Sequence, residues 1–493
     1  MKSIRVCRDC RNAAIRFLAV SICAVLAGCD ESPSQQSDGV SSLQWLAGDH
    51  HIHSQYSVSW DGSVEPSAPE LRGHGTYTIP HNAVMARHFG LDWTVATDHG
   101  GRAHSRISIE QAYPTLLIAR EAVPDLIQFY GVELNPPGAD HASVIVAQSA
   151  DEAEQIYSIE SQFDRSNVGR LEPLGPEADD ESRMLEALEF MEGFAQKPVV
   201  IANHPARTSD AQGFGRTGPT ELRDWNDTAP EIAIGMEGAP GHQAAGLIPE
   251  NYPREARPRG VYPRVPTRGG FDLMTAELGG VWDAMLGEGR KWWITATSDS
   301  HRHWTEGGND FWPGEYSKTY VYASKTYSSI LQSLREGRVF VTTGDLIEEL
   351  EFTVSSGTDT ATVGGSLVVS AASDLVVTIR VKDPSGSNYN GDLPEVRRID
   401  LIVGNVNPSL IEAAERSNPS THALRRFTEA DWVREGDYLS MNHRIAGVEG
   451  SVYLRIRGTN TDEMEPLPDE LGENPWQDLW FYSNPVFVFV PSG

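Results

Sequence analysis

The sequence predicts an α/β barrel followed by an antiparallel β-sandwich, and two textures along its 493 residues support this. From Trp45 to about Asp345, short apolar runs alternate with helix-like stretches, which is typical of a parallel sheet covered by helices. Because the alternation repeats many times, we expect the sheet to close into a barrel with its catalytic groups at the carboxyl ends of the strands. After Asp345, only short strand-like runs separated by turn residues remain, the spacing expected for a β-sandwich.

The barrel strands are predicted where an apolar run ends in polar or charged residues: 93–97, 126–130, 142–146, 198–202, 232–234 and 292–297. Helices are expected between them, for example at 82–89 and 182–194. The strands of the sandwich are predicted at 351–354, 366–370, 375–381, 398–403, 451–457 and 485–490. A chain of this length exceeds a single core, so we expect two folded domains, 45–345 and 346–493.

The N-terminal segment has the composition of a secretory signal. Five basic residues in 1–16 precede an apolar stretch at 17–27, which is too short to cross a bilayer as a mature helix. The stretch ends in Leu-Ala-Gly-Cys29, which resembles the lipobox of bacterial lipoproteins. We therefore expect residues 1–28 to be a signal peptide and Cys29 to be lipidated, with ordinary secretory cleavage as the alternative.

Residues 29–44 are rich in Ser, Gln and Gly and predict a flexible tether between the lipid and the fold. The expected product is an exported protein, held to a membrane by the lipid on Cys29 and facing the periplasm or the cell exterior. Its other cysteines lie in the removed segment, so neither a disulfide nor a thiolate metal site is expected.

The charge of the chain bears on its partners. The formal net charge is −29, and it becomes more negative when the basic signal segment is removed. Because phosphate backbones bind basic surfaces, this balance argues against nucleic acid as a partner. A small-molecule substrate is expected instead.

Histidine is concentrated in the predicted barrel, where thirteen of the fifteen histidines lie between His50 and His303. Polar motifs adjoin its apolar runs at 49–53 (DHHIH), 97–100 (TDHG), 131–133 (GVE, with His141 eight residues later), 202–205 (ANHP) and 298–301 (SDSH). Neutral imidazoles with carboxylates suit Zn, Mn or Fe, and a bridging glutamate can hold two ions roughly 3.5–4 Å apart. Hydrogen-bonded loop histidines are the alternative for any one motif, but five such motifs beside strands favour metal ligation.

The order of these motifs, His-x-His, Asp-His, Gly-x-Glu, His, His-Pro and Asp-x-His, resembles that of the polymerase and histidinol phosphatase (PHP) superfamily over residues 45–345. The resemblance implies a distorted (β/α)7-type barrel that holds two or three divalent transition-metal ions. It implies a first site of His51, His53, Glu133 and Asp299, a second of Glu133, His141 and His204, and part of a third from His99 and His301.

The third site is where this chain departs from the family pattern. Trinuclear members supply another His or an Asp shortly after the first motif, and here Asp61 on a longer loop is the candidate. Occupancy of the third site therefore stays open. Asp98 is expected to orient a ligand rather than to bind metal. Segments 45–49, 337–344 and 483–486 also resemble secreted PHP metallohydrolases related to carbaryl hydrolase.

Three further residues near the motifs are candidate substrate contacts. Arg207 follows His204 by three residues and Arg302 adjoins His301, so either could clamp a phosphate or carboxylate; surface pairing is the alternative. His242 follows the run at 232–234 and either lines the pocket or belongs to a structural turn.

These features predict a metal-dependent hydrolase that cleaves a small phosphomonoester or related ester through metal-activated water, with Glu133 at its centre. One alternative is a carbamate or carboxylic ester hydrolase of the carbaryl-hydrolase type, for which Trp304 and Trp312 could form an aromatic wall. Another is a non-catalytic lipoprotein that binds a metal or ligand, although such a protein has no need for the full set of motifs.

Overall fold

The computed structural model describes residues 42–61, 63, 68–101, 104–166, 179–407 and 417–491. The predicted signal peptide, Cys29 and most of the predicted tether lie outside these residues. Ser42–Gly493 form one compact unit. Within the described ranges, no helix combines the length and the apolar character needed to cross a bilayer.

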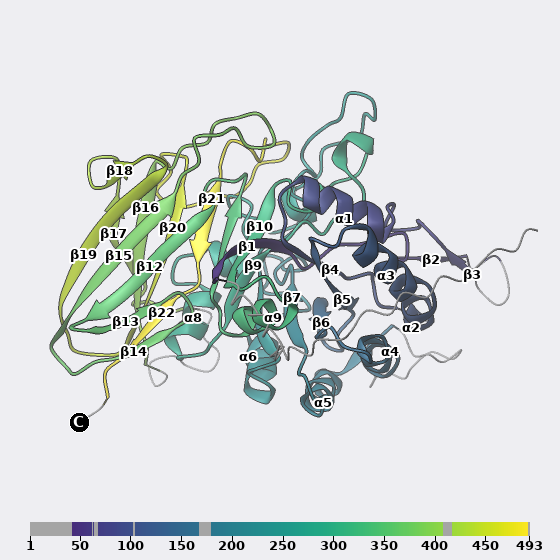
Figure 1. The fold of residues 1–493 in the computed structure, drawn as a ribbon, viewed down its shortest axis with the longest axis horizontal. Coiled ribbons are helices and arrows are strands. Elements are labelled where there is room, and N and C mark those ends of the chain that lie inside the picture. Colours follow the sequence, from purple (N-terminus) through teal and green to yellow (C-terminus); the bar gives the residue numbers. More distant parts are fainter. Residues whose placement is uncertain are drawn as a thin grey trace, which may run out of the picture. The chain divides into compact units, whose positions relative to one another are not determined.

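The first part of the unit alternates strands and helices around a large sheet (Figure 1). Its strands are β1 (Gln44–Asp49), β4 (Trp93–Ala96), β5 (Ile127–Leu134), β6 (His141–Ile145), β7 (Val199–Asn203), β8 (Ala233–Ala239), β9 (Trp293–Ala296), β10 (Ser317–Ala323) and β11 (Val339–Thr343). A separate antiparallel pair is formed by β2 (Ser59–Asp61) and β3 (Ala68–Glu70).

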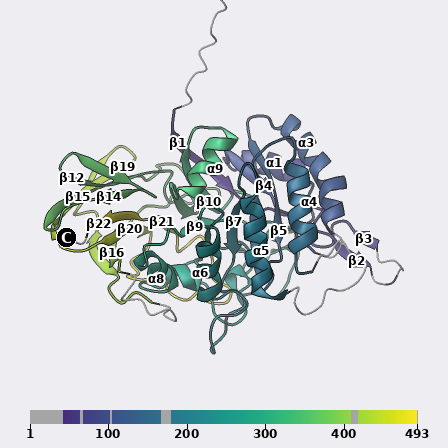
Figure 2. The same cartoon turned by 90° about the horizontal axis from the view of Figure 1, so that it is seen from below.

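The helices are α1 (Ile79–His88), α2 (His104–Ile107), α3 (Tyr113–Ala122), α4 (Glu152–Phe163), α5 (Glu181–Glu192), α6 (Pro219–Thr228), α7 (Leu273–Ala276), α8 (Val281–Gly287) and α9 (Tyr327–Arg335). Short turns of 3-10 or π type are η1 (Ser108–Ala112), η3 (Arg259–Val261) and η4 (Trp304–Glu306). Helices α4, α5 and α6 lie next to one another beside the strands (Figure 2).

Local signals explain where these elements begin. Helix α1 starts earlier than predicted because Thr78 accepts a hydrogen bond from the backbone N–H of His81, 3.2 Å away, and Pro80 suits the first turn. Strand β7 is buried at every position, as expected for a central strand covered on both faces. The predicted apolar runs overlap β4 to β9, so the α/β character of this part is confirmed.

The sheet is mixed, whereas the sequence predicted a parallel one. Strands β1, β4 and β5 pair in parallel, as do β7, β8 and β9, but β6 is antiparallel to both β5 and β7. A short apolar run carries no signal of its direction, which is why the prediction was wrong for β6. The reversal places His141, the first residue of β6, opposite Asn203, the last residue of β7.

The loops after β1 and β9 meet at the edge of the sheet where these strands end. Ile52 and Ser300 form an isolated parallel bridge, and the backbone N–H of His53 donates to the Ser300 carbonyl oxygen at 3.0 Å. The first and last motifs of the chain are thereby brought into contact.

The C-terminal part consists of strands, as predicted, although those at Ser373–Lys382 and Tyr438–Val448 are longer than the predicted runs. One five-stranded antiparallel sheet contains β13 (Asp359–Thr362), β12 (Glu349–Ser356), β15 (Ser373–Lys382), β19 (Tyr438–Val448) and β18 (Val433–Glu435), in that spatial order. The remaining strands are β14 (Ser366–Val368), β16 (Arg398–Asn405), β17 (His422–Phe427), β20 (Val452–Thr459), β21 (Trp480–Ser483) and β22 (Val486–Phe489).

The large sheet continues from the first part of the unit into the C-terminal part. Strand β21 pairs antiparallel with β11 and with β20, so the residues on either side of position 345 share one sheet. The predicted domain boundary at 345 lies in the turn between β11 and β12. Buried residues of both parts belong to one continuous hydrophobic core.

Candidate metal centre

The predicted motifs converge at one edge of the large sheet. Each is carried there by a strand: His51 and His53 by β1, His99 by β4, Glu133 by β5, His141 by β6, His204 by β7, and Asp299 and His301 by β9. His141 reaches the same edge from the start of its strand because β6 runs in the opposite direction.

Four side chains of this edge form the most buried group. His51 Nε2 lies 2.9 Å from Glu133 Oε1, 3.2 Å from Asp299 Oδ1 and 3.0 Å from His53 Nε2. His53 Nε2 lies 3.0 Å from Asp299 Oδ1. Ligands that share one ion at about 2.0–2.2 Å stand roughly this far apart. The group therefore has the donor types and the spacing of a divalent metal site.

Glu133 joins this group to a second one. Its Oε1 lies 3.0 Å from His141 Nδ1 and 3.4 Å from His204 Nε2, and its Oε2 lies 2.6 Å from His99 Nδ1. A buried carboxylate that faces imidazoles on several sides has the position required to bridge two ions.

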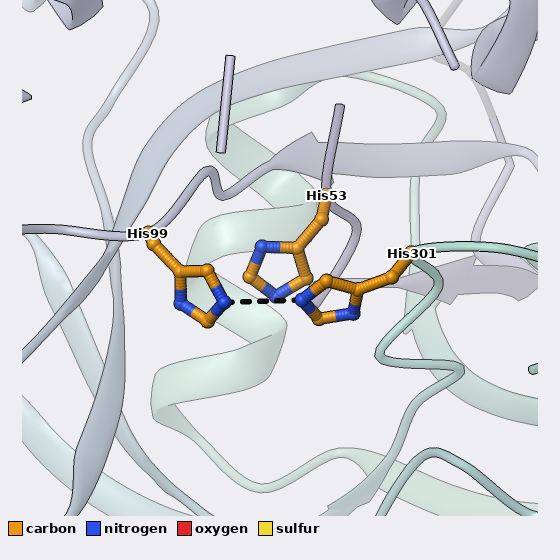
Figure 3. A group of neighbouring side chains, drawn as sticks. All are labelled: His53, His99 and His301. Carbon is orange, nitrogen blue, oxygen red and sulfur yellow. Dashed lines mark hydrogen bonds between the residues drawn. The ribbon is translucent and has the colours of Figure 1, made fainter. Parts of the chain in front are cut away.

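A third group of rings lies at the opening of the cluster. His53, His99 and His301 come from separate segments and point toward one another, with His99 Nε2 3.1 Å from His301 Nε2 (Figure 3). The ring of the exposed His74 stands edge-on to His99, with 5.5 Å between centroids. Asp61, the other residue expected here, ends β2, and its side chain is outside what the structure describes.

Several polar atoms of the cluster are buried in close contacts that do not have the geometry of a hydrogen bond. Glu133 Oε2, Asp299 Oδ1 and His204 Nε2 are buried and take part in no hydrogen bond within the described part of the chain. A buried polar atom without a partner costs free energy, so protein interiors rarely keep one. Here all three atoms belong to candidate ligands, and the residues present therefore fit divalent metal ions.

The hydrogen bonds behind the rings set the orientation of two candidate ligands. His51 Nδ1 donates to Glu237 Oε1 at 2.7 Å. Ser57 Oγ donates to Asp98 Oδ1 at 2.8 Å and accepts from His53 Nδ1 at 2.9 Å. With both Nδ1 atoms protonated, neutral rings present their Nε2 lone pairs to each other, an arrangement that a shared cation stabilises.

The pKa shifts of Glu133, His53 and His301 favour the protonation states that metal ligands need. Burial raises the pKa of Glu133, but His141, His51 and His99 outweigh it and the net pKa lies well below its usual value. Burial, together with the rings of His301 and His99, lowers the pKa of His53 well below its usual value. Burial also lowers the pKa of His301 to about 4.

The carboxylates of the cluster favour a positive charge at its centre, where His51 lies. Burial opposes a charge on His51, yet Asp299, Glu133 and Glu237 raise its pKa well above the ordinary value. The same carboxylates that raise this pKa would stabilise a bound cation.

His242 lies against the cluster and makes two ion pairs. Its Nε2 is 2.9 Å from Asp299 Oδ2, and its Nδ1 is 2.5 Å from Asp310 Oδ1. Burial opposes its charge, but Asp299 and Asp310 raise its pKa to about 10. Asp310 Oδ2 in turn accepts the backbone N–H of His301 at 2.7 Å. His242 and Asp310 therefore fix both residues of the last motif.

The two candidate arginines lie in different surroundings. The Arg207 guanidinium stands 3.4 Å from His141 Nδ1 and 3.9 Å from Asp299 Oδ2, at the partly open side of the cluster. The side chain of Arg302 is exposed, and its guanidinium lies over the ring of Tyr252 at 5.9 Å. The structure thus brings Arg207 to the candidate ligands and places Arg302 at the surface.

The backbone is strained at three residues of the site. His204, His242 and Asp299 have φ angles of 31°, 56° and 46°, in the left-handed region that residues with a Cβ rarely adopt. Such conformations persist where the surroundings hold them, and they gather at functional sites.

Sequence reasoning missed several residues that support the cluster. Glu237 Oε2 accepts the backbone N–H of His204 at 2.7 Å, and Asp140 Oδ2 lies 3.2 Å from His204 Nδ1. Asn203 Nδ2 donates to Glu133 Oε1 at 3.1 Å. The sequence held a signal for two of them, because Asn203 and Asp140 adjoin motif histidines.

Other residues of the histidine-rich region have structural places. His50 is buried and hydrogen-bonded to Ser143 and Thr295. The Trp312 ring lies 4.3 Å from that of Tyr77 and stacks on His303 at 5.2 Å, so it packs with these rings.

No family model matches this sequence, and no curated protein matches it. Among solved structures, the chain is similar to Endonuclease Q in complex with a 27-mer duplex substrate that has an abasic lesion at the active site. The identity is 15%, the TM-score is 0.25, and the match covers 41% of this chain and 45% of that chain. The conclusion therefore rests on the geometry of the side chains. This mixed α/β chain has a cluster of His, Glu and Asp side chains suited to divalent metal ions.

Proposed function

We propose that this chain is a metal-dependent hydrolase of the PHP type, with a closed, distorted barrel and at least two divalent transition-metal ions around Glu133. One observation carries the proposal. The Nε2 atoms of His51 and His53 face each other at 3.0 Å beside Asp299 and Glu133, while their Nδ1 atoms are occupied by Glu237 and Ser57. This arrangement suits a cation better than any hydrogen bond among the side chains themselves.

The residues divide into two metal sites that share Glu133. His51, His53, Glu133 and Asp299 would hold the first ion, and Glu133, His141 and His204 the second. His99 and His301 form part of a third site, with Asp61 as the further ligand that the family pattern suggests. When bound, such ions supply an activated water and the positive charge that stabilises a developing oxyanion.

The remaining residues orient ligands and bind the substrate. Asp98, through Ser57, holds the ring of His53, and Glu237 holds the ring of His51. His242 holds Asp299 through its Nε2. Arg207 makes long contacts with His141, Asp140 and Asp299, at 3.4, 3.6 and 3.9 Å, and its guanidinium would exchange these for an anionic group of the substrate.

A small phosphomonoester is the substrate that these surroundings favour. Its phosphate matches the positive charge of Arg207 beside the metal sites. The carbamate or carboxylic ester alternative drew on the C-terminal part, the export signal and an aromatic wall of Trp304 and Trp312. Trp312 packs against Tyr77 and His303, which gives its part of that wall no support. Arg302, which lies at the surface, stays a candidate only for contacts outside the cluster.

A substrate panel tests this function. The full chain, prepared with Zn, Mn or Fe, is assayed on phosphomonoesters, phosphodiesters, carbamates and aryl esters, and Arg207→Met serves as the discriminating variant. For a phosphatase, Arg207→Met raises KM for phosphomonoesters. Turnover confined to carbamates or neutral esters, unaffected by Arg207→Met, would replace the phosphatase assignment. Failure to bind any of these metals would refute the hydrolase.

The cellular location is proposed from the N-terminal sequence. The lipobox-like segment before Cys29 supports export and lipid anchoring, with the fold facing the periplasm or the cell exterior. The acidic charge of the chain supports a small-molecule substrate rather than nucleic acid.

A further inference from the structure

We propose that the C-terminal segment around Trp476 and Asp478 is a positioning element of the metal centre, acting through Arg259 on His242. This inference rests on the proposed function, because it assumes that Asp299 is a metal ligand. It assigns to the C-terminal part a role in metal affinity that its sequence does not indicate.

Arg259 is the link between the two parts of the chain. Its buried guanidinium donates to Asp478 Oδ1 at 2.8 Å and Glu473 Oε1 at 3.2 Å, both in the C-terminal part. On its other side, Nε donates to Gln243 Oε1 at 2.6 Å. Since a guanidinium is planar and always charged, carboxylates that hold one side of it fix the direction of the other.

Gln243 is the neighbour of His242 in the sequence. The backbone next to Arg259 makes a second contact with this pair. The N–H of Gly260, the residue after Arg259, donates to the His242 carbonyl oxygen at 3.1 Å. His242 has a φ of 56°, so its conformation needs support from outside. Gly260 supports the backbone of His242 directly, and Arg259 supports it through the neighbouring Gln243.

The partner of His242 is held by the same C-terminal segment. Asp310 accepts from His242 Nδ1, and the next residue, Phe311, packs against Trp476 with 5.2 Å between ring centroids. The hydroxyl of Tyr316 donates to the Pro475 carbonyl oxygen at 2.9 Å. Asp310 therefore adjoins a residue that the C-terminal segment contacts, and His242 is connected to that segment through Gln243 and Arg259.

The chain of contacts ends at a candidate ligand. His242 Nε2 lies 2.9 Å from Asp299 Oδ2, while Asp299 Oδ1 faces His51 and His53. A displaced His242 would let the carboxylate of Asp299 rotate away from the other ligands. Because partners behind a ligand set its geometry, loosening the C-terminal segment is expected to weaken metal binding.

The three carboxylates Asp469, Glu473 and Asp478 form a group that could itself be read as a cation site. Arg259 occupies its centre, with Nε 3.7 Å from Asp469 Oδ2 in addition to the contacts above. The group is therefore explained by the guanidinium that it surrounds.

Cobalt titration of the full chain tests the inference, with Co2+ as the probe and its visible absorption as the readout. Asp478→Asn removes the charge that holds Arg259 and keeps the shape of the side chain. Its Co2+ dissociation constant is expected to rise by about tenfold, the low end for residues that support a ligand. Tyr453→Phe is the matched control, because it removes another hydrogen bond between the two parts, that of Tyr453 to Asp283 at 3.0 Å on α8.

A double-mutant comparison separates positioning from general destabilisation. In a His242→Asn background, Asp478→Asn should weaken Co2+ binding no further, because the path from Asp478 to Asp299 passes through His242. Equal losses with and without His242, or an equal loss in Tyr453→Phe, would overturn the inference. If Asp478→Asn does not fold by circular dichroism, Glu473→Gln takes its place, with the same expected results. Absence of Co2+ binding by the unmutated chain would instead refute the proposed metal centre.

Discussion

His51 donates from Nδ1 to Glu237 at 2.7 Å, and this hydrogen bond turns Nε2 of the same ring to within 2.9 Å of Glu133. A buried carboxylate thus stands behind a ring that faces a second buried carboxylate. Residues in the place of Glu237 fix both the tautomer and the direction of a ligand.

Glu237→Gln is expected to weaken metal binding by about 10–100-fold, because the amide neither attracts the Nδ1 proton as strongly nor carries charge. Isothermal titration with Zn2+ measures the effect. Glu152→Gln is the control, since Glu152 is equally buried but pairs with Arg120 on α3 and not with a candidate ligand. Similar losses in both variants would mean that Glu237 acts on general stability.

Glu133→Gln should abolish activity more completely than Asp61→Ala. Glu133 contacts His51 and His141 in two different groups, so losing its charge should remove or misplace both ions. Asp61 would serve only a third site. Elemental analysis of both variants accompanies the activity measurements. Equal losses of activity at unchanged metal content would contradict this division of roles.

Cys29→Ser is expected to release the chain from membranes and leave its chemistry unchanged. Lipid chains contribute about 0.8 kcal/mol per buried CH2, so their loss should make the chain soluble. Fractionation of cells that express the variant gives the result. A variant that still sediments with membranes would argue against a lipid anchor on Cys29.

The buried pair of His104 and Glu160 should make stability depend on pH. His104 Nδ1 lies 2.8 Å from Glu160 Oε1. Burial opposes the charge on His104, but Glu160 raises its pKa from 6.5 to about 9. A raised pKa stabilises the fold below the unfolded value, and this stabilisation is lost as the pH rises from 6.5 through 9.

Thermal unfolding of the chain and of His104→Gln checks this pair. The difference in Tm between them should be largest below pH 6.5 and should shrink toward pH 9. His422→Gln is the control, because His422 is exposed and lies far along the sequence from His104 and Glu160. A difference that is constant with pH would show that His104 contributes through packing alone.

The sequence predicted the parts of the site that depend on neighbouring residues in the chain. The strand runs that precede His99, His204 and Asp299 were found because apolar stretches end abruptly in polar motifs. The direction of β6 could not be predicted, because pairing partners and not composition decide it. The supporting role of Glu237 was not predicted for a related reason. Glu237 is a single acidic residue within an apolar strand, and only the fold brings its partner His51 beside it.

The C-terminal part shows a similar limit. Its short runs separated by turn residues predicted strands, and β15 alternates between buried and more exposed residues, as a strand with one covered face does. Nothing in that pattern indicated that β21 would join β11 in one sheet, or that Asp478 would reach Arg259. Contacts between distant segments depend on tertiary packing, which a single sequence does not display.

The reversed direction of β6 has a consequence for the order in which the site assembles. Glu133 and His141 lie on neighbouring antiparallel strands joined by a short connection, so they can meet early, while the chain is still largely unfolded. His51 and Asp299 stand near opposite ends of the barrel region and can meet only after the intervening strands are ordered. One half of the proposed centre is formed by residues close in the sequence and the other half by distant residues, so we expect tight metal binding only once the fold is complete.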